Sequence, residues 1–222
     1  MKYDVIIIGA GPGGIFSAYE LIKGNKDIKV AVFEAGRPLE QRKCPIDGKK
    51  IKSCINCPSC AIMNGFGGAG AFSDGKYNIT NDFGGTLYEH IGKEAALELM
   101  YYVDEINVSH GGQGTKMYST TGTSLKKTCM QNKLKLLDAS VRHLGTDKNY
   151  IVLKNIYNEL QERVDFFFMT PVEKLETLAN GYRVITAKDS YECDKCIVSV
   201  GRSGSKWMEK ICQELEIPTM SN

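Results

Sequence analysis

The chain has 222 residues, of which 42% are hydrophobic and 24% charged, and its formal net charge at pH 7 is +2. This length leaves room for one large domain or two small ones with a well-filled core. Basic residues are scattered along the chain, so nucleic acid is not an expected partner. No run of 18 apolar residues occurs, so neither a membrane span nor a signal peptide is predicted. We therefore expect a cytoplasmic protein.

The first 37 residues have the pattern of a strand, a glycine turn, a helix and a second strand. An apolar run over residues 2–8 is followed by the turn Gly9-Ala-Gly-Pro-Gly-Gly14, and apolar residues then recur at helical spacing over 15–22. A second buried strand is predicted over residues 29–34, and it ends in the carboxylate of Glu34.

Each part of this segment suits the binding of a dinucleotide. Gly9 allows a tight turn, Gly11 lets the backbone approach a pyrophosphate, and Gly14 lets the helix pack closely on the strand. The helix N-terminus offers N–H groups to phosphates. An acid about 20 residues beyond the turn accepts hydrogen bonds from ribose hydroxyls and disfavours a 2′-phosphate, and Glu34 has this position. The segment therefore predicts a nucleotide site.

Four of the eight cysteines are clustered with the spacing C-x9-C-x2-C-x2-C, and they are Cys44, Cys54, Cys57 and Cys60. In a reducing compartment, clustered thiols more often bind metal or carry out redox chemistry than form disulfides. A C-x2-C-x2-C run with a fourth cysteine before proline is typical of a 4Fe–4S site. Zinc, which accepts four thiolates, and unligated or disulfide-forming thiols are the alternatives.

The other cysteines are interpreted mainly as packing residues. Cys193 and Cys196 form an incidental pair, one of which belongs to the core, and Cys129 and Cys212 lie in helical patterns that bury small side chains. The three histidines have no acidic or hydroxyl partner at a spacing that indicates a catalytic triad. The sequence therefore assigns no catalytic residue.

A glycine-rich segment follows the clustered cysteines. Residues 62–76 contain five glycines and two alanines, and Ser73, Asp74 and Lys76 add polar groups. So little side-chain bulk lets the backbone lie close to a flat or phosphorylated group, whereas a flexible loop is the alternative.

The remaining chain alternates between helical and strand patterns. Helical spacing over residues 84–108 and 123–143 predicts core-facing helices, and Thr146 and Asp147 are suited to begin another helix. We expect a buried parallel strand over 164–169, an antiparallel meander, a returning strand and a final amphipathic helix from Ser205 that buries Trp207. The meander strands are predicted over 172–178, 182–188 and 190–194, with a turn at Asn180-Gly181, and the returning strand over 196–200.

Five segments together resemble the uncharacterised FAD-dependent dehydrogenases of bacteria and archaea, also described as NAD(FAD)-utilising dehydrogenases. These segments are residues 9–34, 34–37, the cysteine loop, 67–76 and 198–204. This family is similar in fold to the glutathione-reductase-like flavoproteins, and the resemblance spans essentially the whole chain. It implies that FAD occupies the Gly9 site. The expected cofactor contacts are Gly9, Gly11, Pro12, Gly13, Gly14, Glu34, Ala35, Gly36, Arg37, Gly68, Ala69, Gly70, Ala71, Phe72, Ser73, Asp74, Val172 and Gly201.

The predicted fold is α/β, with a Rossmann-like FAD-binding domain whose parallel sheet carries an antiparallel β-meander and is interrupted by a mostly helical insert. We expect the cofactor domain over residues 1–80 and 145–205, with a cysteine-rich loop over 44–60, and the insert over 81–144. Residues 206–222 would begin a truncated C-terminal region, because members of the resembled family are longer and contact the flavin again near their C-terminus. Three interpretations of this length stay open: a natural short form, a fragment, or half of a split enzyme that a partner chain completes.

Two functions are consistent with these patterns. In the first, the protein is a flavin oxidoreductase that takes a hydride from NAD(P)H or another small molecule and passes electrons on through the cysteine-bound centre. In the second, it is a non-catalytic FAD-binding or metal-binding module that needs a partner chain.

Overall fold

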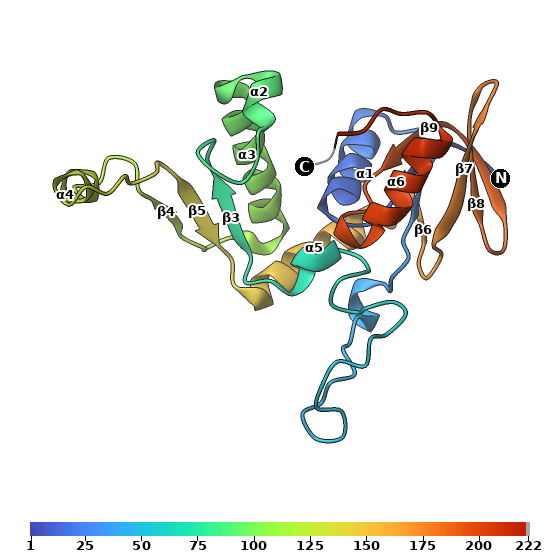
Figure 1. Ribbon diagram of the computed structural model, residues 1–222, viewed down its shortest axis with the longest axis horizontal. Helices are drawn as coiled ribbons and strands as arrows, with labels where there is room; N and C mark the ends of the chain where they lie inside the picture. The colour runs from blue at the N-terminus through green and yellow to red at the C-terminus, as the bar shows by residue number, and fades with distance from the viewer. Residues whose placement is uncertain (221–222) are drawn as a thin grey trace. The chain divides into compact units, whose positions relative to one another are not determined.

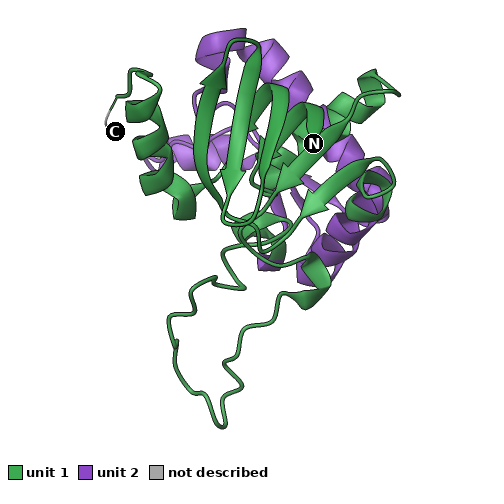
Figure 2. Cartoon of the chain, turned by 90° about the vertical axis from the view of Figure 1, so that its right-hand side faces the viewer, with its two compact units in different colours: residues 1–71, 157–222 green, residues 72–156 purple. Residues whose placement is uncertain are grey.

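The computed structural model describes residues 1–220 and divides the chain into two compact units. The first unit contains residues 1–71 and the chain from Tyr157 onward, and the second contains residues 72–156 (Figure 2). Helix α5 (Thr146–Leu160) begins in the second unit and ends in the first. Within residues 1–220, no helix combines the length and the apolar character needed to cross a membrane.

The first unit is built on a six-stranded sheet with the order β6-β2-β1-β9-β8-β7. Figure 1 labels β6, β7, β8 and β9 of this sheet. Strands β1 (Lys2–Ile8), β2 (Val30–Phe33), β6 (Val164–Phe167) and β9 (Ser190–Val198) pair in parallel. All four residues of β2 are buried, as expected for a parallel strand covered on both faces. Helix α1 (Pro12–Gly24) connects β1 to β2. The predicted strand–turn–helix–strand segment and the parallel strand at 164–169 are thus confirmed.

The antiparallel part of this sheet is the predicted meander of β7 (Val172–Leu178), β8 (Gly181–Thr186) and β9. Gly181 has φ +102° at the predicted turn, a conformation that favours glycine. The prediction of two separate strands over 190–194 and 196–200 is wrong, because one continuous strand, β9, runs from Ser190 to Val198. No turn residue interrupts it, so its first part pairs with β8 while its later part continues beside β1.

One apolar cluster joins the sheet of the first unit to helix α6 (Ser205–Glu214). Cys193 is 1% exposed within this cluster, and Cys196 and Trp207 pack against it while partly exposed. Packing roles are therefore confirmed for Cys193 and for Cys212, which is also buried. The buried members are Tyr3, Ile6, Ile8, Ala31, Phe33, Val172, Leu175, Val184, Cys193 and Ile211.

The second unit contains helices and a small antiparallel sheet of order β3-β5-β4. Its strands are β3 (Lys76–Ile79), β4 (Met117–Ser119) and β5 (Ser140–His143). Its helices are α2 (Leu87–Ile91), α3 (Lys93–Asn107) and α4 (Leu125–Gln131), with a π-helical turn over Val108–Gly112. The helical conformation predicted over 84–108 is confirmed, with a break at Gly92, where φ is +85°. The predicted core-facing role holds for α3, whereas α2 and α4 bury none of their residues.

The single helix predicted over 123–143 is wrong in its second half. Helix α4 ends at Gln131, and Lys133 adopts a left-handed φ of +60°. The chain then enters β5, where the Arg142 guanidinium donates to both carboxylate oxygens of Asp104 at 2.6 and 2.8 Å. This ion pair with α3 is nearly buried. The Arg142–Asp104 pair is a tertiary contact, and the helical periodicity of the sequence does not predict such contacts.

Candidate cofactor site

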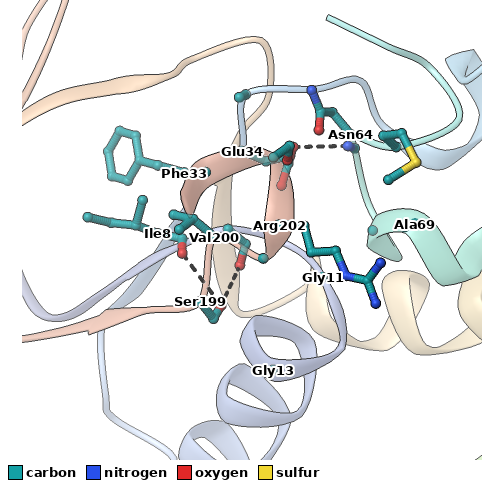
Figure 3. Close-up of a pocket in the computed structure, with 18 of the residues that line it drawn as sticks. Ile8, Gly11, Gly13, Phe33, Glu34, Asn64, Ala69, Ser199, Val200 and Arg202 are labelled. Atoms are coloured by element: carbon teal, nitrogen blue, oxygen red, sulfur yellow. Dashed lines mark hydrogen bonds between the residues drawn. The ribbon is translucent and has the colours of Figure 1, made fainter. Parts of the chain in front are cut away.

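A cavity of about 780 Å³ lies in the first unit where β1, β2 and β9 end (Figure 3). This volume falls within the range of small-molecule sites, and the carboxyl ends of parallel strands are where such sites form in open α/β sheets. Five stretches of chain contribute lining residues, and they fall within residues 8–13, 33–35, 63–70, 170–172 and 199–207.

The glycine turn after β1 is sterically restricted. Gly9 has φ +104°, and its N–H donates to Phe33 O at 2.7 Å. A Cβ at Gly9 would lie 2.5 Å from Ser199 O, and a Cβ at Gly14 would lie 1.9 Å from Gly9 O. Both distances are too short for a methyl group. Glycine is therefore needed for the tight turn at Gly9 and for the close packing at Gly14, as predicted.

The N-terminus of α1 faces this cavity without a side-chain cap. Gly11 is the N-cap residue and makes no side-chain hydrogen bond, and the first turn of α1 contains no acidic residue. A Cβ at Gly11 would meet only Gly68 Cα, at 3.9 Å, so the space beside Gly11 is open to a ligand. The first N–H groups of a helix have no intrahelical acceptor and carry partial positive charge. This end of the cavity is therefore suited to an anion.

Glu34 is 8% exposed and ties three backbone segments together. One carboxylate oxygen accepts the Ala10 N–H at 2.8 Å. The other accepts the N–H groups of Gly36 at 2.7 Å and Gly65 at 2.9 Å. Because a carboxylate has about four acceptor positions, one remains for a ligand hydroxyl. The expected contact with a ligand stays a prediction, whereas this structural role was not predicted.

The glycine-rich segment is held against the turn that follows β2. A Cβ on Gly36 would lie 2.3 Å from Gly65 N. The Phe66 N–H donates to Arg37 O at 3.1 Å, and the Gly67 N–H donates to Ala10 O at 2.8 Å. The absence of side chains at these glycines therefore permits two backbone segments to pack directly on each other beside the cavity.

Not all of the predicted contact residues line the cavity. Gly14, Gly36, Arg37 and Ala71 are outside the lining, and Phe72, Ser73 and Asp74 belong to the second unit. Those that do line it are Gly9, Gly11, Pro12, Gly13, Glu34, Ala35, Gly68, Ala69, Gly70, Val172 and Gly201.

Sequence reasoning missed several lining residues. Ser199 and Arg202 follow β9, Trp207 lies in the first turn of α6, and Asn64 belongs to the glycine-rich segment. Ser199, Arg202 and Trp207 could have been predicted from the rule that ligand sites form at the carboxyl ends of parallel strands, because they lie at or after the end of the predicted returning strand. Trp207, interpreted as a core residue, both packs on the core and lines the cavity, and its indole N–H donates to Glu173 O at 3.3 Å.

Arg42 is a buried residue next to this site, and its side chain holds a neighbouring segment of backbone in place. It is 3% exposed, and its guanidinium donates to Ala61 O, Phe66 O and Ile62 O at 3.0, 2.6 and 2.8 Å. Burial lowers the pKa of this guanidinium, while the charge of Glu34 opposes the shift. The sequence contains no signal for this role, because the three carbonyls come from residues about 20 positions away.

Replacing Arg42 by leucine should lower the free energy of unfolding by about 3 kcal/mol, because buried carbonyls lose charged donors. Lys43→Ala is the matched control, since Lys43 is exposed and adjacent. Urea denaturation of both variants measures the difference. Equal midpoints for Arg42→Leu and the unchanged protein would refute the organising role.

The structure gives the predicted cysteine-bound centre no support. Cys44 and Cys54 are exposed, whereas Cys57 and Cys60 are half-buried, on a long loop that Figure 2 shows extending from the first unit. Among residues 1–220, no group of three or more histidine, cysteine or acidic side chains is placed to hold a metal ion. The iron–sulfur and zinc centres therefore stay predictions.

Comparison with known proteins places the fold. No family model matches the chain, and no curated protein matches it. Glycine oxidase from Geobacillus kaustophilus superposes with a TM-score of 0.54 at 16% identity, over 97% of this chain and 58% of that one. NikD, an unusual amino acid oxidase essential for nikkomycin biosynthesis, superposes with a TM-score of 0.51 at 13% identity, over 96% and 54%.

The fold is shared with these oxidases. Glycine oxidase from Bacillus cereus also matches, with a TM-score of 0.50 at 14% identity, over 97% of this chain and 58% of that one. The architecture is the predicted Rossmann-like α/β fold, in which an antiparallel meander extends a parallel sheet. The chain spans 54 to 58% of the length of these three solved structures.

Proposed function

We propose that the cavity binds FAD and that the chain is the cofactor-binding part of an FAD-dependent oxidoreductase. The observation that carries this proposal is the convergence of three features in one cavity of about 780 Å³. These are the glycine turn, the uncapped N-terminus of α1 and the carboxylate of Glu34. The fold shared with glycine oxidase and NikD supports the same proposal.

The described residues fit the parts of this cofactor. Backbone N–H groups at Gly11 and Gly13 would hold the pyrophosphate, and the remaining acceptor position of Glu34 would hold a ribose hydroxyl. Val172 and Trp207 supply apolar surface for a flat ring. The closed packing of Gly36 on Gly65 keeps these groups in place before a ligand arrives, which lowers the ordering cost of binding.

Flavin, when bound, supplies hydride transfer, while the protein binds and orients it. We infer that a small organic molecule or NAD(P)H is the electron donor. This chain has one visible dinucleotide fingerprint, so a nicotinamide would have to use another kind of site. Residues of this chain would then fix the cofactor and exclude water from one of its sides.

A non-catalytic FAD-binding module is the second candidate. The cavity supports it, because Glu34, the one carboxylate among the described lining residues, already accepts three backbone hydrogen bonds. In that case, a partner chain or further sequence would complete the substrate side, and this chain would contribute the cofactor alone.

Anaerobic purification followed by an absorption spectrum and flavin release tests the proposal. We expect bound FAD in a one-to-one ratio, reducible by NADH, NADPH or an amino acid if the chain is an enzyme. Flavin that binds but is reduced by none of these would favour the module. A protein that takes up no FAD would refute both candidates. Iron, sulfide and zinc analysis of the same sample tests whether the cysteines bind metal in the anaerobically purified protein.

A further inference from the structure

Two charged residues, Glu34 and Arg202, are found among the described residues that line the cavity. Glu34 already accepts three backbone hydrogen bonds. Arg202 is exposed, and within residues 1–220 its guanidinium has neither an ion pair nor a side-chain hydrogen bond. By contrast, Arg142 and Arg163 are each held by carboxylate or carbonyl oxygens. The guanidinium of Arg202 therefore has its positive charge and its N–H donors available to a ligand in this cavity.

The backbone that presents Arg202 is a tight glycine turn after β9. Gly201 has φ +63°, which favours glycine. A Cβ on Gly204 would lie 2.5 Å from Val200 Cβ, so the chain folds back on itself around Arg202. Figure 3 shows the Arg202 side chain extending toward the part of the cavity where Gly11 and Ala69 lie. The turn thus directs the guanidinium to the end of the cavity that contains the α1 N-terminus.

Two sources of positive charge at the same end of one cavity attract an anion. The N-terminus of α1 carries about half a positive charge and the guanidinium a full one. No acidic residue in the first turn of α1 compensates them. A guanidinium has a planar set of donors that matches two phosphate oxygens at once. The chemistry at this end of the cavity therefore matches a diphosphate better than a neutral or singly charged group.

We propose that Arg202 binds the pyrophosphate of the cofactor and makes the site select nucleoside diphosphates over nucleosides. This inference rests on the proposed function, because it assigns a selectivity residue to the same cavity. The dinucleotide is then held at two points, since the glycine turn supplies backbone donors on one side and Arg202 supplies a charged fork on the other.

Calorimetric titration with ADP and with adenosine separates the two parts of the ligand. For Arg202→Ala we expect ADP to bind about 20-fold more weakly than to the unchanged protein, because charged hydrogen bonds are lost, while adenosine binds as before. Arg202→Lys should recover part of the ADP affinity, since it restores the charge without the fork. Lys206→Ala is the matched control, because it removes one exposed cation outside the cavity lining and should leave both affinities unchanged.

The outcomes distinguish this inference from the proposed function. If Arg202→Ala binds ADP as tightly as the unchanged protein, Arg202 is not a pyrophosphate ligand, while the cavity remains a nucleotide site. If it loses adenosine and ADP affinity equally, Arg202 has a structural role and the inference is overturned. If the unchanged protein binds neither ADP nor FAD, the proposed function fails and this inference fails with it.

Discussion

Replacing Gly14 by alanine should lower the free energy of unfolding by about 3 kcal/mol, at the upper end of the usual cost of overpacking. The reason is geometric, since the added methyl group would lie 1.9 Å from Gly9 O. Gly9 lies between β1 and α1, and Gly14 lies in the first turn of α1, so relief requires a backbone shift of the glycine turn or of the start of the helix. FAD should bind much more weakly to this variant, because the N–H groups at Gly11 and Gly13 would move.

The same helix offers the matched control for this substitution. Gly24 is the last residue of α1, and a Cβ there would meet nothing within 4 Å. Gly24→Ala should therefore leave stability unchanged or raise it by up to about 1 kcal/mol. Chemical denaturation of both variants, with flavin affinity measured on the same samples, gives the comparison. A Gly14→Ala protein as stable as Gly24→Ala would contradict the close packing.

Replacing Glu34 by alanine should cost about 4 kcal/mol of stability, because three buried backbone N–H groups lose their acceptor. Glu34→Gln should cost less, since one side-chain oxygen remains, although its NH₂ group then faces a donor. Both variants should lose FAD affinity, because the glycine turn and the glycine-rich segment are no longer joined.

Glu173→Gln controls for the loss of a carboxylate, since Glu173 is exposed. Its stability and FAD affinity should match those of the unchanged protein. Thermal and urea unfolding, followed by equilibrium flavin binding, test all three variants. Glu34 would have no joining role if Glu34→Ala unfolded at the same urea concentration as Glu173→Gln.

Local patterns predicted those parts of the fold that local contacts determine. The segment from β1 to β2 was predictable because apolar runs, glycines and an acid follow one another in sequence. The turn at Gly181 was predictable for the same reason, since its positive φ favours glycine. Fold class followed from these elements and from the resemblance to the flavoproteins.

Contacts between distant residues explain what could not be predicted. Strand β5 has a helical pattern in sequence, but Arg142 pairs with Asp104 from α3. The role of Arg42 depends on the fold, which brings the carbonyls of Ala61, Ile62 and Phe66 to its guanidinium.

The spacing of the clustered cysteines is also a local signal. A metal site needs ligands that converge in space, and the described residues do not show this convergence.

Half of the candidate site was likewise accessible from sequence. The glycine turn and Glu34 belong to a recognisable fingerprint. Arg202 and Trp207 follow β9, and they reach the cavity because β9 lies beside β1, nearly 200 residues earlier in the chain. Such pairing is a property of the sheet topology, so the selectivity role proposed for Arg202 depends on the structure.

FAD titration followed by tryptophan fluorescence tests the central claim most directly. Trp207 is the single tryptophan of the chain and lines the cavity, so its emission reports on ligands bound there. We expect saturable quenching by FAD with one-to-one stoichiometry, reversed by excess ADP. Emission that stays unchanged by FAD, together with no flavin retained after dialysis, would contradict the assignment of this cavity as an FAD site.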